Sequence, residues 1–175
     1  MKTETKKIRR AIVIQAHSGL FATGMLLCSP LTSADILAIG EGYGNIKSQE
    51  ATATFLRYQK DAPRLWNQDS FYEIALGSWN GSNHNNASGV ARGLRWPWSQ
   101  KNFISTELGI AYVTRTTDHL GTQGQFFFHG TLGHQFEKYT LSIGETHYSN
   151  GQRVLHWHGP NIGEDFLTLQ LGRKF

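Results

Sequence analysis

The stretch Asp165-Phe-Leu-Thr-Leu-Gln-Leu-Gly-Arg-Lys-Phe175 ends the chain and alternates along most of its length. Counted back from Phe175 in steps of two, one face carries Arg173, Leu171, Leu169, Leu167 and Asp165, and the other carries Lys174, Gly172, Gln170, Thr168 and Phe166. Residues two apart share one face of a β-strand. The stretch therefore predicts a strand with a leucine face that meets an apolar environment.

Seven further stretches alternate in the same way and are rich in aromatic residues. They span 35–44, 51–60, 70–79, 88–96, 102–115, 124–136 and 139–148. Eight antiparallel strands of roughly 9–11 residues form the smallest barrel that spans a bilayer. We therefore predict an all-β fold, an eight-stranded antiparallel transmembrane β-barrel. The polar stretches 81–88 and 150–163 are expected as long loops outside the cell, and Glu137-Lys138 as a tight periplasmic turn.

The alternation alone does not say which face of the barrel is wet. A membrane barrel turns its leucines outward to lipid, whereas a soluble lipocalin-like barrel turns them inward around a ligand. Three features favour the membrane: the leader described below, the terminal Phe175, which resembles the assembly signal of outer-membrane barrels, and tryptophans near predicted strand ends. Those tryptophans, expected as an interfacial girdle, are Trp66, Trp79, Trp96, Trp98 and Trp157.

The first 34 residues have the pattern of a cleavable secretory signal peptide. The basic start Lys6-Lys-Ile-Arg-Arg10 precedes an apolar middle, and Thr32-Ser-Ala34 supplies small residues before a cleavage site. We therefore predict a signal peptide over 1–34 and a barrel over 35–175. The only cysteine, Cys28, would leave with the signal, so the barrel has neither a disulfide framework nor a cysteine nucleophile.

The net charge of +4 does not indicate a nucleic-acid partner. Residues 1–34 hold five of the 17 Lys and Arg residues and one of the 13 Asp and Glu residues, so twelve of each sign remain in residues 35–175. The basic excess therefore belongs to the signal peptide. The barrel is neutral, and we expect no nucleic acid as a partner.

The seventh stretch carries a candidate catalytic pair. Tyr139, Leu141 and Ile143 form its apolar face, and His147 and Ser149 continue that parity toward the end of the strand. Polar groups aimed at the outer leaflet are costly and need a reason. The spacing of two brings an imidazole close to a serine hydroxyl, which is the arrangement that a general base and its nucleophile require.

A third group would complete the pair, because an imidazole that acts as a base is held in one tautomer by a carboxylate. We expect that carboxylate on the last strand, which begins at Gly163-Glu-Asp165 beside the end of the seventh. Asp165 has the parity of the leucine face and points to the same exterior surface as His147. Glu164 points inward unless a bulge shifts the register.

The halves of this pattern, His147-Tyr-Ser-Asn-Gly151 and Pro160-Asn-Ile-Gly-Glu-Asp165, followed by the alternating last strand, resemble the PagL-type lipid A 3-O-deacylases. The resemblance is specific over the C-terminal part and extends to the rest of the barrel in length and strand count. It implies an eight-stranded barrel in the Gram-negative outer membrane that hydrolyses the ester at position 3 of lipid A with a His-Ser-acid triad.

By this resemblance, Ser149 attacks the acyl carbonyl, His147 acts as general base and then acid, and Asn150 helps to stabilise the oxyanion. The acid of the family is typically Glu, which favours Glu164, whereas the count along the motif and the strand parity favour Asp165. We keep Asp165 as the first candidate and Glu164 as the second. The implied partners are lipopolysaccharide, through its lipid A, and the outer membrane; a homodimer is left open.

Ester hydrolysis by such a triad requires no cofactor. His156 and His158 lie two apart and could share a metal ion, but no carboxylate or thiolate is spaced to complete a site, so we expect none. Two other functions stay open from the sequence: a non-enzymatic small outer-membrane barrel with a structural or adhesion role, and a periplasmic lipocalin-like lipid binder.

Overall fold

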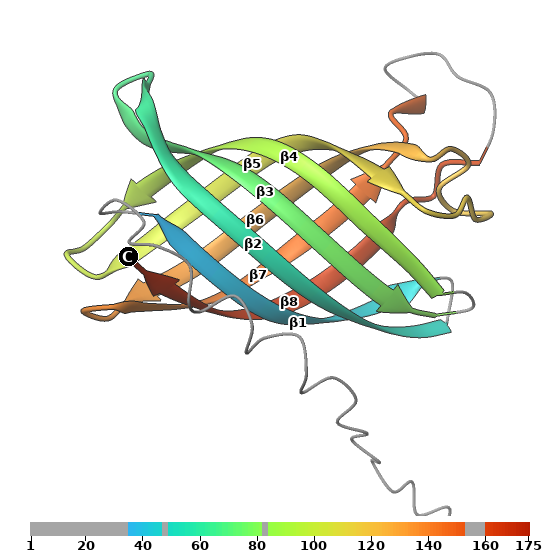
Figure 1. The fold of residues 1–175 in the computed structure, drawn as a ribbon, viewed down its shortest axis with the longest axis horizontal. Helices are drawn as coiled ribbons and strands as arrows, with labels where there is room; N and C mark the ends of the chain where they lie inside the picture. Colours follow the sequence, from blue (N-terminus) through green and yellow to red (C-terminus); the bar gives the residue numbers. More distant parts are fainter. Residues whose placement is uncertain (1–34, 47–48, 82–83, 153–159) are drawn as a thin grey trace, which may run out of the picture. The chain divides into compact units, whose positions relative to one another are not determined.

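In the computed structural model, the chain forms a closed antiparallel barrel in which β1 pairs with β8 (Figure 1). The structure describes residues 35–46, 49–81, 84–152 and 160–175. The strands are β1 (Ile36–Ile46), β2 (Gln49–Leu65), β3 (Gln68–Asn80), β4 (His84–Pro97), β5 (Asn102–Val113), β6 (Gly124–Gln135), β7 (Tyr139–Ser149) and β8 (Glu164–Lys174). Each predicted stretch is a strand, which confirms the fold class. The predicted signal peptide, Trp157 and the pair His156 and His158 lie outside the described residues.

The connection between β3 and β4 is shorter than predicted. The register pairs Asn80 with His84, so most of the polar stretch 81–88 belongs to β4. Asn85 explains this, because its side-chain Nδ2 donates to the carbonyl of Arg115 (2.9 Å) and its Oδ1 accepts from the backbone N–H of Arg115 (3.0 Å). Polar side chains at the rim are thus satisfied by a neighbouring connection, and the stretch pairs as a strand.

The leucine face of β8 points out of the barrel. Leu167, Leu169 and Leu171 are 60%, 58% and 53% exposed, whereas Phe166, which precedes them on the opposite face, is fully buried. The other strands continue this outer apolar band with Tyr72, Ile74, Leu76, Leu108, Ile110, Phe128, Leu132, Leu141 and Ile143. An outward apolar band is what a lipid-facing barrel requires, so the lipocalin-like alternative, with leucines inward, is wrong. Within the described ranges, no helix is long and apolar enough to cross a membrane.

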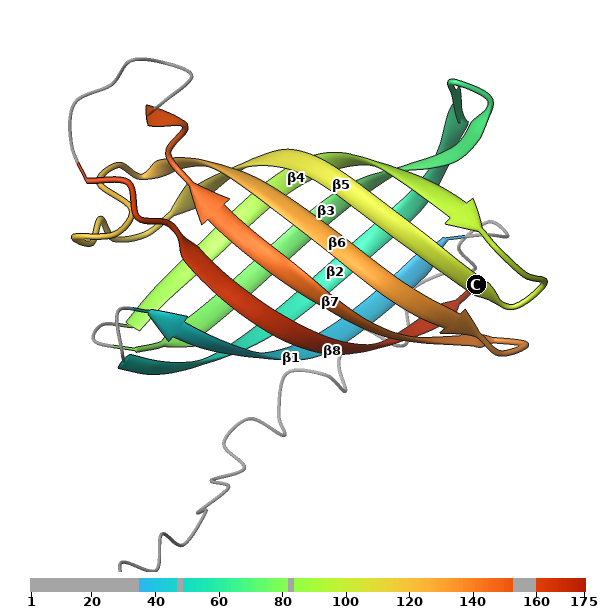
Figure 2. The same cartoon turned by 180° about the vertical axis from the view of Figure 1, so that it is seen from behind.

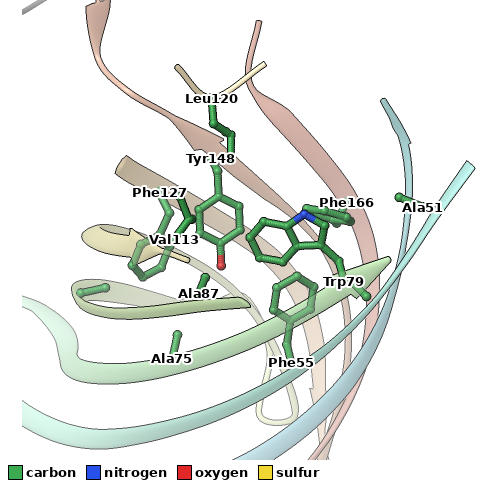
Figure 3. Close-up of a cluster of buried hydrophobic side chains, with 12 residues drawn as sticks. Ala51, Phe55, Ala75, Trp79, Ala87, Val113, Leu120, Phe127, Tyr148 and Phe166 are labelled. Carbon is green, nitrogen blue, oxygen red and sulfur yellow. The ribbon is translucent and has the colours of Figure 1, made fainter. Parts of the chain in front are cut away.

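The barrel interior is filled by side chains in two layers. The first is an apolar cluster in which the ring of Tyr148 lies 5.3 Å from Trp79 and 5.8 Å from Phe127, measured between ring centroids (Figure 3). Trp79 is 2% exposed. Its assignment to the interfacial girdle was wrong, because its place in the alternation of β3 turns it into the lumen.

The second layer is polar. The guanidinium of Arg57 pairs with the carboxylates of Glu73 (2.5 Å) and Glu107 (2.8 Å) and donates to the hydroxyl of Thr146 (3.0 Å). All four side chains are buried. Buried charges are tolerated where they are paired and hydrogen-bonded, as here. The two layers pack the lumen with side chains as a folded core.

The two ends of the barrel differ. The C-terminus and the Glu137-Lys138 turn lie at one end, and the β5–β6 and β7–β8 connections lie at the other, which we call the loop end (Figures 1 and 2). The tight turn is where it was predicted, since β6 ends at Gln135 and β7 begins at Tyr139. The candidate catalytic residues lie at the loop end, because β7 ends and β8 begins there.

Candidate active site

The alternation of β7 places His147 and Ser149 on the outer surface. Tyr148, between them, is 2% exposed and packs into the interior aromatic cluster (Figure 3). Because neighbouring side chains on a strand point to opposite faces, this anchor turns its two neighbours outward. His147 and Ser149 are half-buried at the rim, on the same face as Leu141 and Ile143.

The register of β7 and β8 brings His147 opposite Asp165. Their Cα atoms are direct partners across the sheet, and Nδ1 of His147 lies 2.5 Å from Oδ1 of Asp165. The contact is open to solvent, with the two side chains 38% and 55% exposed. A carboxylate only accepts hydrogen bonds, so Nδ1 carries the proton in this contact, and a neutral ring then leaves Nε2 free to accept one.

Glu164 lies on the other side of the sheet. It is 3% exposed, and its Oε1 is 3.4 Å from the hydroxyl of Thr117 inside the loop end. Phe166 is fully buried on the same interior face and fixes the parity of β8. The structure therefore pairs His147 with Asp165 and separates it from Glu164.

Asn161 joins the nucleophile candidate to the β7–β8 connection. Its Oδ1 accepts hydrogen bonds from the hydroxyl of Ser149 (3.2 Å) and from the backbone N–H of Asn150 (3.0 Å). The backbone N–H of Gly151 in turn lies 3.3 Å from the oxygen of Ser149. The sequence offered no reason to assign Asn161 a role, although it belongs to the motif. Its distance from Ser149 along the chain does not show that the β7–β8 connection folds back to bring the two side chains together.

The side chain of Asn150 points into the protein. It is 2% exposed, and Nδ2 donates to the carbonyls of Leu120 (3.0 Å) and Pro160 (2.9 Å), while Oδ1 accepts from the backbone N–H of Gln152 (3.0 Å). Both amide protons are thus committed to carbonyl oxygens. The side chain of Asn150 has no donor left for an oxyanion, and its structural effect is to tie β7 to two connections.

Gly163 supports the ring of His147. Its φ is +83°, and a Cβ built there would lie 2.6 Å from Cε1 of His147 and 2.9 Å from the carbonyl oxygen of Tyr148. Both distances are shorter than real Cβ contacts, so a side chain at this position would displace the imidazole. The ring therefore packs directly on backbone.

The candidate site is an open surface patch. A cavity of about 270 Å³ lies at the opposite end, near the C-terminus, where its lining includes Asp61, Arg95 and Lys174. His147, Ser149 and Asp165 instead face outward beside the apolar band that begins at Leu167. This position suits a substrate that lies in the membrane beside the barrel.

Comparison with known proteins identifies a family and a fold. A family model described as lipid A 3-O-deacylase (PagL) matches residues 52–174. The structure of the outer membrane enzyme PagL matches with a TM-score of 0.61 and 17% identity, over 78% of this chain and 97% of that one. A designed transmembrane β-barrel matches with a TM-score of 0.53 and 11% identity, over 85% of this chain and 100% of that one. The Yersinia pestis outer membrane protein Ail matches with a TM-score of 0.50 and 10% identity, over 81% and 99%. None of the curated proteins matches the chain.

Proposed function

Since the chain belongs to the lipid A 3-O-deacylase (PagL) family, we propose that it hydrolyses the ester at position 3 of lipid A in the Gram-negative outer membrane. Ser149 is the nucleophile, His147 the general base and then acid, and Asp165 the carboxylate that holds the ring. The observation that supports this assignment is the 2.5 Å contact between His147 and Asp165 on the outer surface at the rim of the barrel, with Ser149 two residues along the same face.

The reaction runs in two steps. Ser149 Oγ attacks the acyl carbonyl carbon while its proton passes to Nε2 of His147, and the proton then goes to the sugar oxygen as the ester bond breaks. Water attacks the acyl-enzyme with His147 again as base, which releases a fatty acid and restores the serine. The products are the free hydroxyl at position 3 and one fatty acid, and no cofactor enters.

One rearrangement precedes attack. The hydroxyl of Ser149 donates to Asn161 in the structure, so it must turn from Asn161 to His147 before attack. Residues two apart on a strand are roughly 6.5–7 Å apart at Cα, which an imidazole spans. Geometry of this kind often tightens only when the substrate is bound.

Backbone N–H groups are the oxyanion donors that we assign. The N–H groups of Asn150 and Gly151 both point at the nucleophile region, the first to Asn161 Oδ1 and the second to Ser149 Oγ. The two N–H groups are consecutive and Gly151 has a φ of +67°, a backbone pattern in which successive N–H groups form a concave anion site. In this assignment the oxyanion replaces Asn161 Oδ1 as the acceptor of the Asn150 N–H. Asn150 thus acts through its backbone, and its buried side chain keeps that backbone in place.

The location of the site explains how the substrate reaches it. Lipid A is itself a membrane lipid, so its acyl ester arrives by lateral motion along the outer apolar band. Lipid A and the bilayer are therefore the partners that we propose for this surface.

The test is mass spectrometry of lipid A from Gram-negative cells that express the wild type, Ser149→Ala or Ser142→Ala. Ser142 lies on the same strand, three residues after its start. The proposal expects one acyl chain to be lost with the wild type and Ser142→Ala, and none with Ser149→Ala. Unchanged lipid A in all three, with folded protein in the outer membrane, would leave the non-enzymatic barrel as the better interpretation.

A further inference from the structure

The β5–β6 connection, residues 114–123, reaches the ends of β7 and β8 at the loop end (Figures 1 and 2). The carbonyl of His119 accepts the backbone N–H groups of Ile162 (2.9 Å) and Gly163 (3.2 Å). The carbonyl of Leu120 accepts Nδ2 of Asn150 (3.0 Å). Two strands that carry no candidate catalytic residue therefore supply a third element to the site.

This connection is held in one conformation. The side chain of Leu120 is fully buried and belongs to the interior cluster with Tyr148 and Phe127 (Figure 3). The hydroxyl of Thr117 accepts the backbone N–H groups of His119 (3.2 Å) and Leu120 (3.1 Å). An apolar anchor and a hydrogen-bonded turn together make the connection stiff enough to fix what it touches.

Gly121 is where the connection meets the β7–β8 segment most closely. Its φ is +64°, and a Cβ built there would collide with the carbonyl oxygen of Pro160 and lie 3.0 Å from Nδ2 of Asn150. At Gly124, the first residue of β6, a built Cβ meets nothing within 4 Å. A side chain would therefore disturb a close contact at Gly121 and none at Gly124.

Pro160 precedes Asn161, whose Oδ1 holds both Ser149 and the backbone N–H of Asn150. We propose that Gly121 is a positioning residue of the deacylase: by letting the β5–β6 connection touch Pro160, it sets the place of Asn161 and through it that of the nucleophile. This inference rests on the proposed function. On this inference, three segments together position the active site: β7, the β7–β8 connection and the β5–β6 connection.

The size of the effect follows from the contact. Ordinary van der Waals separation from a new Cβ requires the Pro160 carbonyl to move by about 1 Å. Misplacement of reacting groups by about 1 Å costs as much as 10²-fold in rate. For Gly121→Ala we expect kcat to fall by about 10- to 100-fold and KM to stay within about twofold, because the lipid-binding outer face is unchanged.

The experiment measures kcat and KM of purified protein in detergent with lipopolysaccharide as substrate, by mass spectrometry of the released fatty acid. The matched control is Gly124→Ala, which should retain wild-type kcat within about twofold. The folded fraction comes from heat-dependent electrophoretic mobility, and rates are expressed per folded molecule. Labelling of Ser149 by a fluorophosphonate probe reports the nucleophile without turnover and should slow in Gly121→Ala but not in Gly124→Ala.

A second variant, Gly121→Asn, separates collision from backbone strain. Asn adopts positive φ more readily than Ala but carries the same Cβ, so the inference expects Gly121→Asn to be as impaired as Gly121→Ala. It also serves as the measurement if Gly121→Ala does not fold. Recovery of wild-type kcat in Gly121→Asn would overturn the inference.

Other outcomes distinguish a failure of this inference from a failure of the proposed deacylase function. An active wild type with equal kcat in Gly121→Ala and Gly124→Ala overturns the inference and leaves the deacylase standing. A lowered unfolding midpoint with unchanged kcat per folded molecule also overturns it, since the glycine would then serve the fold alone. A folded wild type that releases no fatty acid overturns the proposed function and the inference together.

Discussion

Replacing Asp165 by Asn tests which acid holds His147 in the proposed triad. The amide has the shape of the carboxylate but no charge, so His147 loses a charge-assisted partner at 2.5 Å. A hydrogen bond to a charged group contributes about 1.5–3 kcal/mol, and this energy matters most when the ring carries a proton in the transition state. Since about 1.4 kcal/mol corresponds to a factor of ten, kcat should fall roughly 10- to 150-fold.

The exposure of the pair sets the upper limit of this effect. The side chain of Asp165 is 55% exposed, so water screens part of its attraction for the imidazolium. Buried Ser-His-Asp triads lose about 10⁴-fold on the same change. We therefore expect a loss well below that of a buried triad.

Glu164→Gln is the matched control, because Glu164 precedes Asp165 and faces the barrel interior. Glutamine keeps an oxygen that can accept from Thr117, and we expect kcat within about threefold of the wild type. The assay is release of fatty acid from lipopolysaccharide by purified folded protein. A larger loss in Glu164→Gln than in Asp165→Asn would mean that the active conformation has a different register from the one observed. Equal activity of both variants and the wild type would refute the triad.

Three further changes probe the site and its frame. Gly163→Ala should push the imidazole of His147 aside and lower kcat by about tenfold or more, measured in the same assay. Leu169→Arg places a charge on the lipid-facing surface near the middle of β8 and should cost about 2–4 kcal/mol of folding free energy, measured by denaturant titration in lipid vesicles. Arg57→Met leaves two buried carboxylates without their cation and should cost about 3–5 kcal/mol in the same titration. An effect below about 1 kcal/mol in either titration would contradict the assigned face or the buried ion network.

The strands and their faces were predictable because strand geometry has a fixed period. The parity that sends Leu141 of β7 outward also sends His147 and Ser149 outward, and a shift of that strand by one residue would have inverted all three. Trp79 shows that parity, and not closeness to a strand end, decides which face a side chain takes. Its proximity to a strand end suggested a girdle, while its parity in β3 places it inside.

The choice between two adjacent acids depended on register, which a single strand does not encode. Glu164 and Asp165 occupy neighbouring positions, and one bulge between β7 and β8 would exchange their faces. The pairing of His147 with Asp165 decides the contact, because it runs without a shift from Tyr139 to Tyr148. The acid that contacts His147 is therefore decided by the pairing register of β7 with β8, which neither strand specifies alone.

The contacts around Ser149 were not predictable, for a different reason. The groups that hold Asn150 and Gly163 in place are backbone carbonyls, at Leu120 and at His119. Every residue type has such a carbonyl, so a motif cannot mark the residues that supply them. A close approach of two backbone segments leaves no room for a Cβ, and so it requires glycine at the point of contact. Gly121 is such a glycine, because a Cβ there would collide with the carbonyl oxygen of Pro160. A glycine at positive φ, distant in sequence from the motif but touching it in space, therefore indicates where an active site is supported by segments outside its motif.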